Sequence, residues 1–241
     1  MKEAVVFGGQ NSLDFFDVRT SVVRIPEVSI KIEEAQKIWD VQCKTSFSFH
    51  HFLCSEESLF FNNIHLKSLS LAIVQLGLYD RYKRLFRNPH YLVGSINNDS
   101  AMLVATGTIT FQELIMQSQA CTLLRPLSPL QITSTTTTLN GRMLPKFQAY
   151  KISTEQFAEI GSSDSNLSSV IQTLSEQEGI QKIIHIGPGS LEKSLISDAL
   201  ESRDLQIVES IDVDPMLGWF WSNLRKQERS QELVGVTAGA Q

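Results

Sequence analysis

Apolar residues along this chain gather either in short continuous runs or at helical spacing. Continuous runs rich in Val, Ile and Phe predict buried strands, because a strand covered on both faces needs no polar alternation. Apolar residues that recur every three or four positions predict helices. The expected strands cover residues 3–7, 91–93, 182–186, 205–208 and 211–213. The expected helices cover residues 32–41, 66–86, 101–105, 108–120, 167–178 and 190–200, with a last one from Pro215.

Turn residues punctuate this pattern. Asn140-Gly141 is a strong type I′ turn signal, so the Thr-rich segment 132–139 and residues 142–144 are predicted to form a β-hairpin. Gly179 is expected to close the helix before it. Residues 151–165 are polar, with a Ser/Asp loop expected at residues 162–165, and residues 13–57 show little pattern apart from the helical spacing of 32–41.

Strands and helices therefore alternate along most of the chain, and this order predicts an α/β layer architecture. We expect residues 1–225 to form one α/β domain. Residues 226–241 are polar and end in small side chains, so a flexible C-terminal tail is expected there.

Composition narrows the function classes. The 241 residues are 42% hydrophobic with a formal net charge of −5, which suits a globular core and argues against a nucleic-acid partner. No apolar run is long enough to span a membrane, and the N-terminus lacks the apolar region of a signal peptide. The three widely spaced cysteines predict reduced thiols. These observations together favour a cytoplasmic location.

No pattern indicates a metal or a cofactor. His50 and His51 are neighbours in the sequence, so their side chains are expected to point in different directions. Gly187-Pro188-Gly189 precedes an expected helix but does not match a phosphate-binding fingerprint, and a structural turn is the simpler interpretation. We therefore expect neither a metal nor a cofactor.

The segment YLVGSINNDSAMLVATG, residues 91–107, has the order of a strand, a tight turn and a helix. An α/β enzyme presents its nucleophile in such a corner at the edge of its sheet. This corner is the candidate site of the chain.

Five motifs resemble one enzyme family, in its order and near its spacing. VVFGGQNS (5–12) is similar to FxFPGQGSQ, LVGSINNDSAMLVATG to GHSLGEYSALVAAG, and TITFQELI continues as the next helix does. ITSTTTTLNGRMLP is similar to the hairpin PVVSNVxG, and KIIHIGPGS to the turn EVGPG. The chain thus resembles malonyl-CoA:acyl-carrier-protein transacylases and polyketide-synthase acyltransferase domains.

This resemblance implies a fold. It is an α/β-hydrolase-like large subdomain, with a central, mostly parallel sheet flanked by helices, and an inserted ferredoxin-like small subdomain. Few residues separate Cys121 from the hairpin here, so we expect the small subdomain to be missing.

The resemblance also assigns catalytic positions. The oxyanion residue falls on Gln10, the nucleophilic serine on Ile96, and the carboxylate-binding arginine on Cys121. Isoleucine has no heteroatom to serve as a nucleophile, and a thiol cannot form the charged fork of arginine. No histidine occurs between His90 and His185, where the family places its base.

Two hypotheses follow. In the first, the chain is a catalytically inactive acyltransferase-like protein that serves as a binding or scaffold partner in fatty-acid or polyketide synthesis. It would bind an acyl carrier protein, an active acyltransferase or synthase, or CoA or pantetheine, and exposed Ile96 and Met102 would mark the partner surface. In the second, it is an active acyl-CoA:acyl-carrier-protein acyltransferase, in which Ser95 is the nucleophile, His185 or His90 the base, and Gln10 the oxyanion donor.

Overall fold

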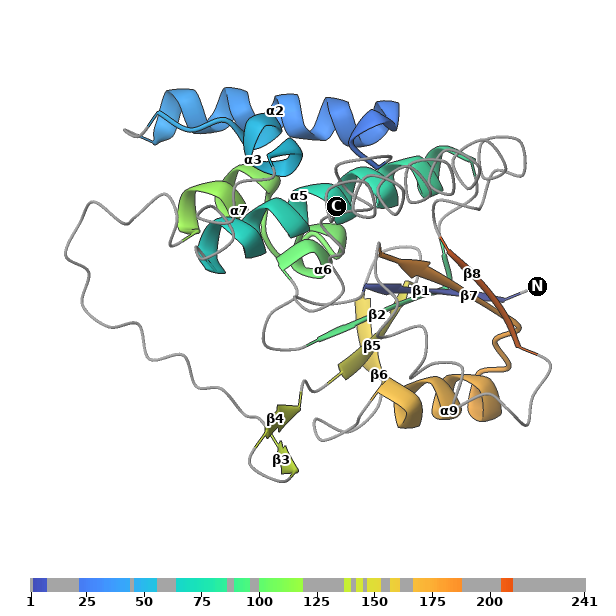
Figure 1. Cartoon of the computed structure of the whole chain (residues 1–241). Coiled ribbons are helices and arrows are strands. Elements are labelled where there is room, and N and C mark those ends of the chain that lie inside the picture. Colours follow the sequence, from blue (N-terminus) through green and yellow to red (C-terminus); the bar gives the residue numbers. More distant parts are fainter. Residues whose placement is uncertain are drawn as a thin grey trace, which may run out of the picture.

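The protein is represented by a computed structural model. It describes residues 2–7, 22–43, 46–55, 64–85, 89–95, 100–118, 137–139, 142–144, 147–152, 157–160, 167–187 and 205–209. These residues form one six-stranded sheet with helices on both faces, and a separate two-stranded hairpin (Figure 1).

The sheet has the strand order β6-β5-β2-β1-β7-β8. Its strands are β1 (Glu3–Phe7), β2 (Tyr91–Ser95), β5 (Phe147–Ile152), β6 (Phe157–Ile160), β7 (Lys182–Ile186) and β8 (Gln206–Glu209). β2, β1, β7 and β8 run parallel, whereas β5 pairs antiparallel with both β2 and β6. The predicted fold class, a central and mostly parallel sheet flanked by helices, is confirmed.

β1 lies in the centre of the sheet, and this position explains why its residues are almost all apolar. Ala4, Val5, Val6 and Phe7 are all fully buried. Val5 and Phe7 belong to the large core on one face, whereas Ala4 and Val6 belong to a smaller core on the other. Because both faces are covered, the strand is apolar at every inner position, as its sequence predicted.

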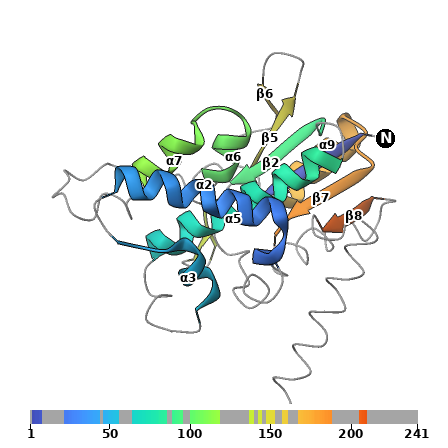
Figure 2. The ribbon, with the colours of Figure 1, turned by 90° about the horizontal axis from the view of Figure 1, so that it is seen from above.

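One face of the sheet is covered by a layer of helices. It comprises the 3-10 turn η2 (Val22–Arg24) and the helices α2 (Pro26–Gln42), α3 (Phe49–Cys54), α5 (Ile64–Leu85), α6 (Ser100–Ala105) and α7 (Phe111–Gln117). Within the described residues, α9 (Leu167–Gln177) alone covers the opposite face (Figure 1). The view from above shows α2 and α5 lying side by side over the sheet (Figure 2).

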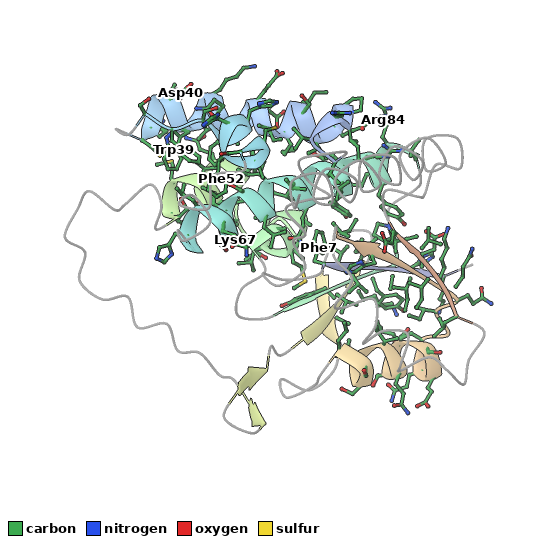
Figure 3. The ribbon with its side chains drawn as sticks, in the orientation of Figure 1. Phe7, Trp39, Asp40, Phe52, Lys67 and Arg84 are labelled. Atoms are coloured by element: carbon green, nitrogen blue, oxygen red, sulfur yellow. The ribbon has the colours of Figure 1, made fainter. Side chains whose placement is uncertain are left out.

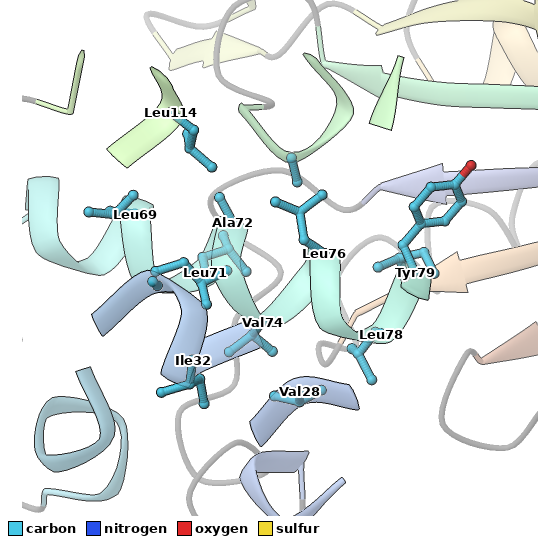
Figure 4. Close-up of a cluster of buried hydrophobic side chains, with 14 of the residues drawn as sticks. Val28, Ile32, Leu69, Leu71, Ala72, Val74, Leu76, Leu78, Tyr79 and Leu114 are labelled. Atoms are coloured by element: carbon cyan, nitrogen blue, oxygen red, sulfur yellow. The ribbon is translucent and has the colours of Figure 1, made fainter. Parts of the chain in front are cut away.

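α5 is the central helix of this layer. Every residue from Leu69 to Tyr79 is buried, because α2 covers the helix from outside and the sheet supports it from within (Figure 4). A helix that is apolar on all sides is a helix in the interior. The predicted helix over 66–86 is thus confirmed. Gln75, a polar residue within this buried stretch, donates a hydrogen bond to the Ile186 carbonyl of β7 over 3.5 Å.

An aromatic cluster attaches α3 to α2. Trp39 and Phe49 meet edge to face with ring centroids 5.4 Å apart, and Phe47 lies 5.6 Å from Phe52. Trp39 and Phe52 lie between α2 and the helices beneath it (Figure 3). This cluster gives structure to part of the segment that showed little pattern, because the aromatic rings of α2, of α3 and of the residues between them bury one another.

The hairpin is confirmed, and it is followed by two strands that the sequence pattern did not predict. β3 (Thr137–Leu139) and β4 (Arg142–Leu144) pair antiparallel, as Asn140-Gly141 predicted. In the polar segment 151–165, β5 ends at Ile152 and β6 occupies 157–160, while the loop expected at 162–165 lies outside the described residues. β5 pairs with the edge of β2 and β6 pairs with β5, which a polar sequence permits on the flank of a sheet.

Helix ends agree with the turn signals. α9 ends as predicted, because Gly179 has a φ of +65° and lies two residues beyond its last turn. The helix expected over 108–120 is shorter, since α7 begins only at Phe111, after Thr110. Thr110 caps it by accepting from the Glu113 N–H, while the Glu113 carboxylate accepts the Thr110 N–H over 2.7 Å.

Several expectations lie outside the described residues. They are the strand at 211–213, the helices at 190–200 and from Pro215, and the tail at 226–241. The domain boundary at 225 and the loss of the small subdomain stay predictions. Within the described ranges, no helix has both the length and the apolarity to cross a bilayer.

The expectation of three reduced thiols is wrong, because Cys43, the residue after α2, is in a disulfide. Cys54 at the end of α3 carries an exposed thiol. Spacing along the chain does not reveal such a pairing, since a disulfide depends on which elements meet in space.

Candidate functional site

The corner between β2 and α6 leaves the middle of the sheet. β2 lies between β1 and β5 and ends at Ser95, and α6 begins at Ser100. Val93, near the end of β2, is paired with Val6 of β1 and is fully buried. The predicted strand and helix are therefore both present, at the carboxyl edge of the parallel strands where α/β enzymes carry their sites.

α6 is held on the core by its inner face. Ala101 and Met102 are buried among the residues of the large core, whereas Leu103 is 36% exposed. Met102 was expected on an exposed partner surface, and that expectation is wrong. Met102 belongs to the buried core to which α5 also contributes, and α6 contacts α5 directly.

The end of α6 is a tight reversal that requires glycine. Gly107 has a φ of +73°, in the left-handed region that side chains disfavour. The Thr108 N–H donates to the Leu103 carbonyl over 2.9 Å, and the Gly107 N–H donates to the Val104 carbonyl over 3.0 Å. This six-to-one and five-to-two pattern is the Schellman motif. The reversal therefore explains why the ATG sequence at the end of the helix, residues 105–107, finishes with glycine.

His90 lies at the wrong end of β2 for a base at the corner. It precedes β2, whereas Ser95 ends it, and five strand residues span roughly 17 Å. Its ring Nδ1 accepts the Glu3 backbone N–H over 3.3 Å. The backbone N–H of His90 donates to the Glu3 carbonyl over 3.0 Å. The structure does not bring His90 and Ser95 together.

His185 lies on β7 and is fully buried. It pairs with Val6, which pairs in turn with Val93, so His185 and Val93 lie two strands, or roughly 10 Å, apart. Its sequence neighbours Ile184 and Ile186 belong to the large core, so alternation directs the His185 ring to the α9 face. Gln10, Ile96 and Cys121 lie outside the described residues, and all catalytic assignments stay predictions.

A pocket of about 250 Å³ opens next to the corner, between α5, α6 and α7. We call it the α5–α6–α7 pocket. Its lining residues are His65, Ser68, Leu69, Ser100, Leu103, Ile109, Leu114, Gln117 and Ser118. Sequence reasoning missed it, because three helices contribute and no local motif joins them. The one signal in the sequence was a histidine and serines near the start of the long helix.

The tyrosines of β2 and α5 hold the amino edge of the sheet. The Tyr91 hydroxyl donates to Glu178, which also pairs with Lys151 at 3.4 Å. Burial, together with this bond to Glu178, raises the pKa of Tyr91 to about 12. Tyr82 donates to Glu3 over 2.8 Å, and burial raises the pKa of Tyr82. These contacts lie at the end of the sheet away from the corner, so their role is structural.

Comparisons with known proteins agree on one fold. No family model matches the chain, and no curated protein matches it. Among solved structures, an acyl carrier protein S-malonyltransferase from Vibrio cholerae superposes with a TM-score of 0.58, over 87% of this chain and 96% of that chain. The fold is that of the malonyl-CoA:acyl-carrier-protein transacylases.

Two further structures agree with this result. A malonyl CoA-acyl carrier protein transacylase from Clostridium perfringens covers 96% of this chain and all of its own, with 12% identity and a TM-score of 0.58. A malonyl-transacylase in complex with its type II polyketide-synthase acyl-carrier protein covers 87% of this chain and 96% of its own, also with 12% identity and a TM-score of 0.58. Identity at this level shows the transacylase fold and does not show the activity.

Proposed function

We propose that this protein is an acyltransferase-like protein that acts by binding rather than by acyl transfer. Its role is that of a binding or scaffold partner in fatty-acid or polyketide synthesis. The observation that carries the proposal is the transacylase fold, combined with a corner whose sequence register places Ile96 where the nucleophile belongs.

Two glycines support that register. Gly107 is required by the reversal after α6, so the match of VATG to the family's VAAG has a structural basis. Gly94 is buried within β2, upstream of the corner. Counting between these two glycines without a gap assigns Ile96 to the position of the serine. A hydrocarbon side chain cannot form an acyl-enzyme intermediate.

The alternative is an active acyltransferase with Ser95 as the nucleophile. One observation favours it, since Ser95 is the last residue of β2, at the carboxyl edge of the sheet. The hydroxyl would need a histidine base within hydrogen-bond reach, about 3 Å. His90 lies at the opposite end of the strand, and His185 lies two strands away from β2, roughly 10 Å from Val93, which makes this alternative the weaker of the two.

An acyl carrier protein is the partner that we propose. Support comes from the structural neighbour that was solved together with its own acyl-carrier protein. CoA or free pantetheine is a further proposed ligand, because each carries the same pantetheine group as a holo acyl carrier protein. A true acyltransferase or synthase remains the other proposed partner, and a cytoplasmic location remains a prediction.

Intact-mass measurement tests the catalytic part. The protein is incubated with malonyl-CoA and, separately, with acetyl-CoA, and its mass is compared with that of Ser95→Ala. We expect no acyl adduct on either protein. A stable adduct on the parent protein that is absent from Ser95→Ala would overturn the proposal in favour of the active enzyme.

Binding is tested separately. Holo acyl carrier protein is titrated into the chain by calorimetry, with an unrelated acidic protein of similar charge as the control. We expect saturable binding of the carrier protein alone. Equal heats from both proteins, or none from either, would contradict a carrier-protein partner.

A further inference from the structure

The α5–α6–α7 pocket has an apolar base and a polar rim. Leu69 of α5 and Leu114 of α7 are 3% and 6% exposed, and both line it. Figure 4 shows these two side chains in the space between α5 and α7. Ser100 and Ser118 line the same pocket, and both are only partly buried. The pocket therefore offers both an apolar surface and hydroxyl groups to a ligand.

The described lining residues offer no permanent charge to pair with a charged ligand. Among the described residues that line the pocket there is no Asp, Glu, Lys or Arg, and His65 is the one titratable group. A carboxylate loses much of its hydration on entering such a site, and a paired cation is needed to compensate. The Ser118 hydroxyl donates to the Ile115 carbonyl over 2.8 Å and can still accept, whereas the Ser100 hydroxyl and the Gln117 amide can donate to a neutral carbonyl.

The pocket is also small. Sites for drug-sized molecules measure roughly 300–1,000 Å³, so a pocket of about 250 Å³ suits a shorter ligand. Ser100 is the first residue of α6, so the pocket borders the corner that follows β2. A group bound at the start of α6 would therefore lie next to the pocket.

We propose that the α5–α6–α7 pocket binds an uncharged short acyl group through its thioester or amide end. This inference rests on the proposed function, which brings an acylated pantetheine arm to this face. It differs from what the names of the structural neighbours imply, because those proteins transfer a malonyl group, which carries a carboxylate. The ligand class is thus the neutral acyl thioester.

The test uses two small thioesters, S-butyryl- and S-malonyl-N-acetylcysteamine, each titrated by calorimetry into the full chain. We expect the butyryl compound to bind with a Kd of about 1 mM or tighter, and the malonyl compound at least about tenfold more weakly. Equal or tighter binding of the malonyl compound, or no binding of the butyryl compound, would overturn the proposal.

Substitutions test whether the butyryl compound binds in this pocket. Leu103→Trp, at a half-exposed lining residue, should narrow the pocket and weaken butyryl binding about tenfold or more. The matched control is Met116→Trp, because Met116 is 41% exposed on α7 and does not line the pocket. If Leu103→Trp does not fold, Gln117→Trp on the exposed rim replaces it. Unchanged affinity in the folded lining variant would overturn the assignment of the site.

Failure of this inference and failure of the proposed function give different results. Carrier-protein binding without butyryl binding refutes the pocket and leaves the proposed function standing. Butyryl binding that Leu103→Trp weakens, in a chain that binds no carrier protein, supports the pocket and refutes the carrier-protein partner.

Discussion

Gly77 of α5 and Val28 of α2 meet so closely that a β-carbon added at Gly77 would lie 2.6 Å from the Val28 Cα. This contact lies at the crossing of the two helices that form the outer part of the large core. Ion pairs accompany the crossing, with Lys31 of α2 2.9 Å from Asp80 of α5 and Arg84 of α5 2.8 Å from Glu27 of α2. The glycine therefore sets the distance between the helices.

Gly77→Ala should destabilise the protein by about 1–3 kcal/mol, because the added carbon forces α2 and α5 apart. Helix propensity alone would change stability in the opposite direction, by up to about 1 kcal/mol in favour of alanine. The free energy of unfolding in urea measures the difference.

Val28→Ala provides a sharp control for that crossing. The closest atom to the added carbon is the Val28 Cα, a backbone atom, so shortening the valine should not restore the stability of Gly77→Ala. Full rescue in the double variant would show that the side chain, and not the backbone, limits the approach.

Gly107 allows a second, independent test of backbone geometry. Nothing lies within 4 Å of a β-carbon built at Gly107, yet its φ is +73°. Gly107→Ala should therefore lower stability by about 1–2 kcal/mol through strain alone. Gly107→Asn should cost less than Gly107→Ala, because asparagine tolerates the left-handed region better. Equal losses in thermal unfolding for the two variants would contradict this explanation.

Glu113 makes stability depend on acid pH. Its carboxylate accepts hydrogen bonds from the Thr110 backbone N–H and from the Thr110 hydroxyl. These bonds, the backbone one most of all, lower the pKa of Glu113 below its ordinary value of 4.5. A lowered folded-state pKa contributes stability above the unfolded pKa, and this stability is lost as the pH falls through the folded pKa. The difference in unfolding free energy between the parent and Glu113→Gln should thus be largest above about pH 5 and shrink below it. A difference in unfolding free energy that is constant from neutral to acid pH would refute this role of the Glu113 carboxylate.

The continuous apolar strands were predictable because burial on both faces leaves one pattern in the sequence. β1 and β7 show it, since Val5 and Ile184 belong to one core and Val6 and Ile183 to the other. β5 and β6 were not predictable by this means. β5 joins the sheet through backbone pairing to β2, and β6 through backbone pairing to β5, and this pairing leaves no side-chain pattern in the sequence.

The candidate site shows the same division. The corner could be located, because a strand, a turn and a helix are adjacent in the sequence. Met102 could not be placed correctly, since its burial depends on how α6 packs against α5. The α5–α6–α7 pocket also depends on packing: His65, Ser100 and Gln117 meet only after three helices assemble.

Tyr91 makes stability depend on alkaline pH. Burial and the bond to Glu178 raise its pKa from 10.0 to about 12. A raised folded-state pKa gives stability that is complete below the unfolded pKa and is lost as the pH rises through the folded pKa. The parent should therefore lose stability relative to Tyr91→Phe between about pH 10 and pH 12. Unfolding free energies across this range measure the effect, and a constant difference would contradict it.

His185 separates the two functional hypotheses. Its ring is fully buried, so His185→Ala should lower stability by about 1–3 kcal/mol through lost packing. If the protein acts by binding, the folded variant keeps the carrier-protein affinity of the parent, and neither protein gains an acyl adduct. If His185 is the base of an active enzyme, an adduct that forms on the parent is lost in the variant. His90→Ala is the matched control, because His90 is exposed at the far end of β2 and its removal should change neither readout.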